Sequence, residues 1–258
     1  MYDLGIVGGM GTQATAVFFD ILTAHTAARK DSEHVCSVIL NRADTPDRTR
    51  FILGKSKDDP FPFLADCLQT LNTIGVRAVA VPCNTAHCFY EKMRECSAAP
   101  VLNMVELTKQ YVAGSSLPKK LCVLATQGTV QSGVYERFGN EGLSVGYPDE
   151  VMCREVQHII EDVKDTAHAD IEQLSRRLAA VMGRTARACE EVTYVLACTE
   201  LSVLDKRFFS AFSVVDAMDI LALVSIEVAG KKMSVGSLPY DGKLIAELAR
   251  SAAQTEEA

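Results

Sequence analysis

The stretch Ala78-Val79-Ala80-Val81-Pro82-Cys83-Asn84-Thr85-Ala86-His87 decides how the rest of the chain is interpreted. Its apolar part is typical of a buried strand, and the polar residues follow the carboxyl end of that strand. A second stretch, Val192-Thr193-Tyr194-Val195-Leu196-Ala197-Cys198-Thr199-Glu200, repeats the pattern. In open parallel sheets, ligands bind at the carboxyl ends of the strands. We therefore expect Cys83 and Cys198 to lie at a ligand site, each at the end of its own strand.

Apolar runs alternate with amphipathic segments throughout the 258 residues. This alternation is typical of an α/β fold in which parallel sheets are covered by helices on both faces. Strands are predicted at 4–7, 35–40, 78–81, 101–104, 121–125, 192–196 and 212–216, and helices at 14–28, 62–74, 105–113, 152–164, 170–189, 220–229 and from 241 onward.

The sequence also repeats itself weakly. When Leu4 is laid on Leu121, an offset of 117 residues, the turns that follow the two strands also coincide. Laying Cys83 on Cys198 gives an offset of 115. Two strand-turn matches that agree to within two residues are what a duplicated α/β half would produce. We therefore expect the two thiols to face each other across a cleft between two similar halves.

The charge balance disfavours nucleic-acid binding, and the hydropathy disfavours a membrane span. The chain has 26 basic and 33 acidic residues, a net charge of -7, and no long basic cluster. No run approaches the roughly 18 apolar residues that are needed to cross a bilayer, and no basic region followed by a cleavable apolar segment opens the sequence. We expect a cytoplasmic protein without nucleic-acid or membrane partners.

The cysteine pattern argues against disulfide and metal frameworks. There are nine cysteines, an odd number, and no Cys-x-x-Cys pair. Cys83, His87 and Cys88 are close in sequence, but no second paired cluster completes a tetrahedral site. We therefore expect no metal, and we expect most of the other cysteines to be small core residues.

Two thiols that face one cleft could form a disulfide, bind a metal or exchange protons with a substrate. The third option fits the neighbouring residues best, because neutral donors such as Asn84 and Thr199 can hold a carboxylate without neutralising a thiolate. Removal of a Cα proton from an amino acid needs a base on one face and an acid on the other. An ordinary thiol has a pKa of about 8.5 and needs local lowering. His87 and the helix start after Cys83 could supply it, and Glu200 beside Cys198 could act as a proton acceptor.

Five motifs occur along the chain in a specific order. They are Gly8-Gly9-Met10-Gly11, Thr45-Pro46-Asp47-Arg48-Thr49, Pro82-Cys83-Asn84-Thr85-Ala86-His87, Thr126 with Gly128-Thr129, and Cys198-Thr199-Glu200. In this order they resemble the aspartate racemase branch of the aspartate/glutamate racemase superfamily, whose members need no pyridoxal phosphate. The resemblance spans nearly the whole length of the chain.

The resemblance implies two flavodoxin-like α/β domains with parallel sheets, related by pseudo-twofold symmetry, and no cofactor. Residues 1–103 with 213–258 would form the domain that carries Cys83, and residues 104–212 the domain that carries Cys198, with the active site in the cleft between them. It also implies that the protein is a homodimer. The implied roles are acid and base for Cys83 and Cys198, contact with the amino and α-carboxyl groups for Asn84, Thr85, Thr126, Thr129 and Thr199, contact with the side-chain carboxylate for Arg48 and Lys164, and a further substrate contact for Met10.

Two departures from the family pattern bear on substrate choice. The chain has Ala197 where the family usually has glycine, and Thr12 where it usually has proline. Two cations at the distal end of the substrate favour a dicarboxylic amino acid, with aspartate first and glutamate second, because an apolar side chain would leave them unpaired. The alternatives are another cysteine-dependent member of the superfamily, such as a hydantoin racemase or maleate isomerase, and a non-catalytic ligand-binding or thiol redox protein.

Overall fold

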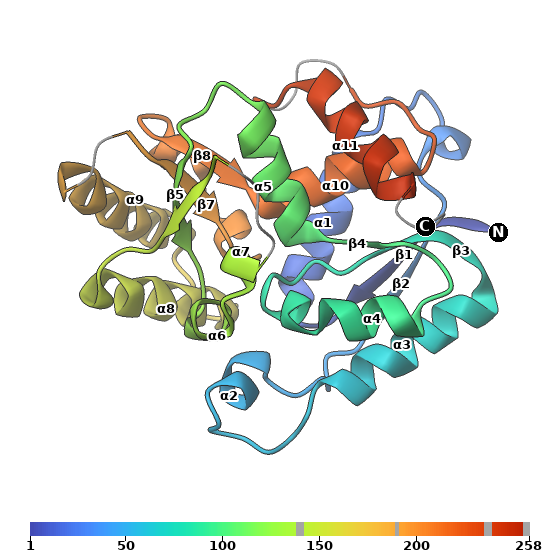
Figure 1. Cartoon of the computed structure of the whole chain (residues 1–258), viewed down its shortest axis with the longest axis horizontal. Helices are drawn as coiled ribbons and strands as arrows, with labels where there is room; N and C mark the ends of the chain where they lie inside the picture. The colour runs from blue at the N-terminus through green and yellow to red at the C-terminus, as the bar shows by residue number, and fades with distance from the viewer. Residues whose placement is uncertain (138–141, 189–190, 235–238, 255–258) are drawn as a thin grey trace.

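The computed structural model describes residues 1–137, 142–188, 191–234 and 239–254 of the chain. Its described part contains two four-stranded sheets with helices around them (Figure 1). The strands are β1 Tyr2–Gly8, β2 Ser37–Asn41, β3 Val76–Ala80, β4 Val101–Leu102, β5 Lys120–Leu124, β6 Ser144–Gly146, β7 Thr193–Leu196 and β8 Ser213–Asp216. The helices are α1 Thr12–His25, α2 Arg48–Ile52, α3 Phe61–Ile74, α4 Tyr90–Cys96, α5 Met104–Gly114, α6 Gln127–Ser132, α7 Val134–Arg137, α8 Glu150–Lys164, α9 Ile171–Ala188, α10 Ala217–Val228 and α11 Gly242–Gln254, with 3₁₀ helices at Asp31–Glu33, Thr85–Phe89, Leu201–Val203 and Lys206–Phe209.

The two sheets have the same topology. Their strand orders are β2-β1-β3-β4 and β6-β5-β7-β8, and all neighbouring strands are parallel. Leu4 faces Ala78 in the first sheet, and Leu121 faces Thr193 in the second. Leu4 and Leu121 differ by the offset of 117 residues, and Ala78 and Thr193 differ by the offset of 115, the same two offsets that the sequence repeat shows. The predicted fold class is confirmed, and the register supports the predicted duplication.

The central strands β3 and β7 are buried because helices cover both faces of each sheet. In Figure 1, α3 and α4 lie beside the first sheet, and α8 and α9 lie beside the second. Between the two sheets, α10 packs against α1 and α5. Ten of its twelve residues are buried, which fits a helix that is apolar on nearly all sides. One core cluster therefore runs through both halves, from Leu4 on β1 to Leu121 on β5.

One predicted boundary is wrong. Residues 213–216 were assigned above to the first domain, but β8 pairs with β7 and completes the second sheet. The apolar pattern of this short strand identifies a strand and carries no information about which sheet it joins. The chain returns to the first half only after β8, where α10 packs on α1. The rest of the division into two domains stays a prediction.

Most predicted elements are present, with small shifts at their ends. The predicted strand at 101–104 is shorter because Asn103 caps α5, accepting a hydrogen bond from the Glu106 N–H at 3.2 Å. Short elements such as α2, α4, α6, α7 and β6 were not predicted. Residue 189 and the end of the chain after 254 lie outside the described residues. None of the described helices is long and apolar enough to cross a membrane.

Candidate active site

A narrow pocket, partly open to solvent, lies where the carboxyl ends of β1, β3, β5 and β7 meet. Ten of the twelve predicted site residues line it; His87 and Thr129 do not. Two further lining residues, Asp47 and Thr49, were missed, although both belong to a motif that the sequence singled out. The lining residues are Met10, Asp47, Arg48, Thr49, Cys83, Asn84, Thr85, Thr126, Lys164, Cys198, Thr199 and Glu200.

The Cys198 thiol lies against an acid. Its side chain is buried, and the thiol donates a hydrogen bond to Glu200 Oε2 at 2.9 Å. Lys164 Nζ, at the end of α8, lies 3.9 Å from the other carboxylate oxygen, Oε1. Burial raises the pKa of Cys198 well above its usual range, and the negative charge of Glu200 raises it further, while Lys164 lowers it. Cys198 therefore holds its proton at neutral pH in this structure.

Cys83 is buried to the same extent, but its surroundings differ. Among the described residues its thiol has no hydrogen-bond partner. His87 binds the main chain of this loop: Nε2 accepts from the Met104 N–H at 3.1 Å, so Nδ1 carries the proton and donates to the Cys83 carbonyl at 2.9 Å. Burial lowers the pKa of His87. A neutral imidazole supplies no positive charge, so these contacts do not support the predicted role of His87 in tuning the Cys83 thiol.

Three threonine hydroxyls form a triangle across the two halves. Thr85, which follows β3, lies 3.1 Å from Thr126 and 2.8 Å from Thr129, and the latter two are 3.1 Å apart, all measured between Oγ1 atoms. Thr126 also caps α6, because its hydroxyl accepts from the Thr129 N–H. Thr126 therefore both caps α6 and lines the pocket. Thr129 does not line the pocket, but its hydroxyl contacts the two threonines that do.

Arg48 is buried rather than solvated, with 8% of its surface exposed. Its Nη1 donates to the carbonyls of Thr45 and Pro46, at 3.3 and 3.0 Å, and its Nη2 donates to the Met10 carbonyl at 2.7 Å. Nε has no partner among the described residues. Three of the five N–H donors are thus engaged, and Nε–H and one Nη2–H remain. A guanidinium edge of this kind can bind a carboxylate in a bidentate manner.

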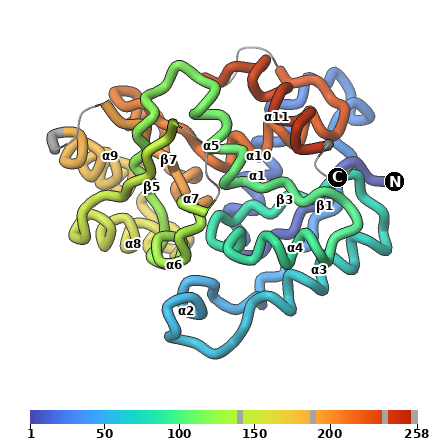
Figure 2. The backbone as a smooth tube through the Cα atoms, in the orientation of Figure 1, coloured from blue at the N-terminus to red at the C-terminus, as the bar shows by residue number. Residues whose placement is uncertain are grey.

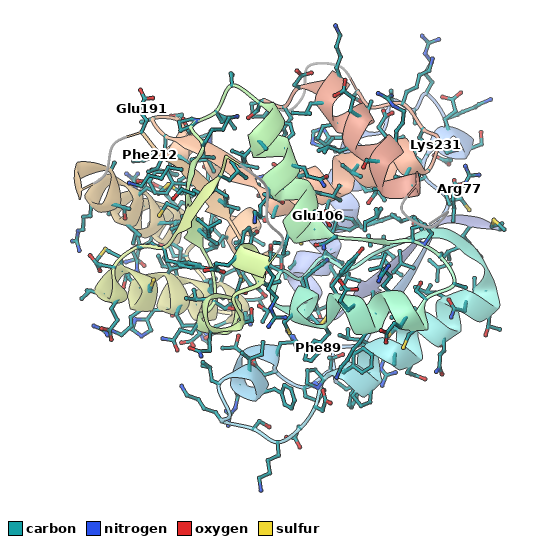
Figure 3. All side chains as sticks on the ribbon, viewed as in Figure 1. Arg77, Phe89, Glu106, Glu191, Phe212 and Lys231 are labelled. Atoms are coloured by element: carbon teal, nitrogen blue, oxygen red, sulfur yellow. The ribbon has the colours of Figure 1, made fainter. Side chains whose placement is uncertain are left out.

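The Arg48 helix is held by contacts within its own half and by close approach to the other. Phe51 on α2 packs against Phe89, with ring centroids 6.2 Å apart, and Phe89 (labelled in Figure 3) also packs against Phe61. The segment that carries α2 projects from the first half and lies beside α6 (Figure 2). A Cβ atom on Gly128 of α6 would lie 2.7 Å from Thr49 Cα, so a side chain there would displace α2.

A second glycine, in the first half, allows a similarly close approach by a residue of the second half. Gly11 corresponds to Gly128 under the offset of 117. A Cβ atom on Gly11 would lie 2.5 Å from Glu200 Oε1. In each half, the glycine at the start of the turn therefore lets the other half approach the pocket closely.

Three lining residues hold a buried polar atom that lacks a hydrogen-bond partner among the described residues. The atoms are Arg48 Nε, Asn84 Nδ2 and Glu200 Oε1. A buried polar group without a partner costs about 1–3 kcal/mol. Two donors and one carboxylate oxygen match a ligand that carries carboxylate oxygens and an ammonium group. Among the described residues, no group of three or more His, Cys, Asp or Glu side chains is placed to hold a metal ion.

Comparison with known proteins agrees with this geometry. Residues 7–224 match the family described as Asp/Glu/hydantoin racemase. The broad-specificity amino-acid racemase RacX of Bacillus subtilis is 28% identical over 228 residues, which cover 85% of this chain and 94% of that protein. The structure of Picrophilus torridus aspartate racemase superposes with a TM-score of 0.80 at 28% identity, covering 95% of this chain and 99% of that one.

The fold extends to more distant proteins. Glutamate racemase from Francisella tularensis, solved in complex with D-glutamate, superposes with a TM-score of 0.61 at 15% identity, covering 98% of this chain and 94% of that one. At this identity the likeness shows the fold alone. The relatives that match over most of the chain are racemases, which are isomerases. From the match over residues 7–224, the chain belongs to the Asp/Glu/hydantoin racemase family.

Proposed function

We propose that this protein is an amino acid racemase that inverts the Cα of aspartate, or secondarily of glutamate, without pyridoxal phosphate. The observation that carries the proposal is the pair of thiols: Cys83 and Cys198 follow equivalent strands of the two halves and line one pocket. Each half supplies one monoprotic acid/base group to a single ligand site. A reaction that removes a proton from one face of Cα and adds one to the other needs two such groups.

The polar atoms that line the pocket indicate how the substrate binds. Asn84 Nδ2 and the hydroxyls of Thr85, Thr126 and Thr199 would surround the α-carboxylate and the amino group. The free edge of Arg48 would bind the side-chain carboxylate, with Lys164 as the second cation. An apolar side chain would leave both cations desolvated and unpaired, so a dicarboxylic amino acid is favoured.

In the resting enzyme Cys198 is the acid. The Cys83 thiolate takes the Cα proton, the electron pair of the broken C–H bond stays on Cα and its carboxylate, and the Cys198 thiol delivers its proton to the opposite face. In the reverse direction Cys198 must first lose its proton, and Glu200 is in hydrogen-bond contact to accept it.

The proposal is tested with purified, reduced protein and no added pyridoxal phosphate. L-aspartate and D-aspartate are incubated separately, and the enantiomers are quantified by chiral chromatography. We expect both reactions to approach an equimolar mixture. If neither does, glutamate and a panel of other amino acids follow, because one relative has broad specificity. Inactivity across the panel would contradict the proposal, and hydantoins and maleate would then test the two alternative reactions. The cytoplasmic location and the homodimer stay predictions.

A further inference from the structure

Tyr135, on the short helix α7 of the second half, reaches a pocket residue of the first half. Its side chain is fully buried, and its hydroxyl donates a hydrogen bond to Asn84 Oδ1 at 2.7 Å. Nothing in the sequence near Tyr135 indicates this contact, because the partner lies 51 residues away. Asn84 is itself 2% exposed and lines the pocket, so the hydrogen bond is shielded from water.

In this structure the contact leaves the nitrogen end of the Asn84 amide facing a ligand. The amide has one accepting oxygen and one donating nitrogen, and a half turn about its last torsion exchanges them. Oδ1 is engaged by Tyr135, and Nδ2 is buried without a partner among the described residues. With the amide turned the other way, an oxygen would replace the nitrogen as the atom available to the ligand. That oxygen would repel a substrate carboxylate instead of donating to it.

Tyr135 is suited to act as a permanent donor. Burial raises the pKa of its hydroxyl well above the usual range, so the proton stays in place. The backbone of Tyr135 is anchored as well: Lys109 Nζ on α5 donates to its carbonyl at 2.6 Å. The phenol therefore has little freedom to leave the amide.

The duplication supplies an internal comparison. The offset of 117 places Phe18 of α1 at the position of Tyr135, and the offset of 115 places Thr199 at the position of Asn84. Phe18 is fully buried in the core. A threonine hydroxyl carries its donor and its acceptor on one oxygen, so it has no second end that could be turned toward the ligand. The half with an amide at the pocket has a tyrosine at this position of the offset, and the half with a hydroxyl has a phenylalanine.

We propose that Tyr135 is a positioning residue, which holds the Asn84 amide so that its N–H groups face the substrate's α-carboxylate. This inference rests on the racemase function proposed above. The hydroxyl belongs to the second half and its partner Asn84 to the first. The orientation of Asn84, and with it substrate binding, therefore depends on how the two halves pack against each other. Its effect is exerted in the ground state and in the transition state alike, because the α-carboxylate is bound in both.

The direct test is Tyr135→Phe, assayed with the amino acid that the wild type racemises. We expect KM to rise about tenfold, with kcat within about threefold of the wild type, because uniform binding is lost. The matched control is Tyr194→Phe, which removes an equally buried hydroxyl that donates to the Met182 carbonyl at 2.7 Å, away from the pocket. This control should lower the melting temperature without changing KM.

A second measurement separates positioning from general damage. In an Asn84→Ala background, Tyr135→Phe should change KM by less than about twofold, since effects that act through one residue do not add. If Tyr135→Phe fails to fold, Asn84→Asp replaces it: Tyr135 can still donate to one oxygen, and the other would face the substrate. We expect KM for Asn84→Asp to rise by about 50-fold or more.

Three results would overturn the inference. They are an unchanged KM in Tyr135→Phe, an equal effect of that substitution with and without the Asn84 side chain, and an unchanged KM in Asn84→Asp. Each of these results can be obtained only if the wild type is active. A failure of this inference can therefore be told apart from a failure of the proposed function. A wild type that racemises no amino acid would contradict the proposed function and this inference together.

Discussion

The two thiol sites share a backbone plan and differ in chemistry. Under the offset of 115, Cys83 corresponds to Cys198, and Thr85 corresponds to Glu200. In the first half the second residue after the cysteine is a hydroxyl in the threonine triangle. In the second half it is a carboxylate that accepts a hydrogen bond from the thiol. The comparison teaches that the duplicated scaffold places two equivalent thiols, and that the second residue after each one differs: a hydroxyl after Cys83 and a carboxylate that contacts the thiol after Cys198.

The same comparison between the two halves accounts for the hydrogen bonds that His87 makes. Its counterpart is Ser202, which donates to Asp216 Oδ1 at 2.8 Å at the end of β8. His87 makes a comparable tie just after β4, where it accepts from the N–H of Met104, the first residue of α5. Both residues therefore hold the loop after the cysteine against the segment at the end of the last strand of their own sheet.

The largest expected effect comes from removing either thiol. Cys83→Ser and Cys198→Ser should each lower the rate of racemisation by about 10²–10⁴, because each removes one of the two acid/base groups. Rates measured by chiral chromatography in both directions check this. The control is Cys36→Ser at an exposed free cysteine, which should keep the wild-type rate. If one of the pocket variants kept full activity, the equal status of the two thiols would be contradicted.

The next effect concerns the distal end of the substrate. Arg48→Lys should raise KM for aspartate by about 100-fold, because an ammonium group cannot both hold the loop carbonyls and offer a bidentate edge. Arg50→Lys, at an exposed site on the same short helix, is the control and should leave KM unchanged. Steady-state kinetics in both directions measure the effect. Equal KM values for the two variants would argue against Arg48 as the carboxylate ligand.

A smaller effect is expected on the pH dependence of the rate when either charged residue near Cys198 is replaced. The two replacements should shift it in opposite directions. In the direction that needs the Cys198 thiolate, the rate rises with pH through the pKa of that thiol. Glu200 raises this pKa and Lys164 lowers it. Glu200→Gln should therefore move the rising limb to lower pH, and Lys164→Gln should move it to higher pH. Shifts of the same sign, measured from kcat/KM against pH, would contradict the electrostatic account of this thiol.

The smallest effect is on stability. Burial lowers the pKa of His87, so the folded protein resists protonating it, and this contribution is present above the ordinary value of 6.5 and is lost as pH falls below it. His87→Gln should be about 1 kcal/mol less stable than the wild type at pH 8, and the difference should narrow as the pH falls. Urea unfolding between pH 5 and 8 measures it, with His158→Gln at an exposed position of α8 as the control. A difference independent of pH would contradict the assignment of a buried neutral imidazole.

The sequence predicted the parts of the site that are local in the chain. Cys83 and Cys198 could be identified because an apolar run sets each strand and the next residues must lie at its carboxyl end. The roles of Tyr135 and His87 could not be predicted, because each depends on hydrogen bonds to distant segments. For the same reason the sequence could not assign residues 213–216 to the second sheet, since pairing between strands leaves no trace in a four-residue pattern.

The most direct test of the two-thiol account follows deuterium at low conversion. L-aspartate is incubated in heavy water, the reaction is stopped after a few per cent of turnover, and both enantiomers are analysed by mass spectrometry; the experiment is then repeated from D-aspartate. We predict that the product carries deuterium at Cα while the remaining substrate keeps its proton, in both directions, because one thiol removes the proton and a different, solvent-exchanged thiol delivers the deuteron. Deuterium appearing in the remaining substrate as fast as in the product would show a single base that serves both faces, and would contradict the assignment of one acid/base thiol to each half.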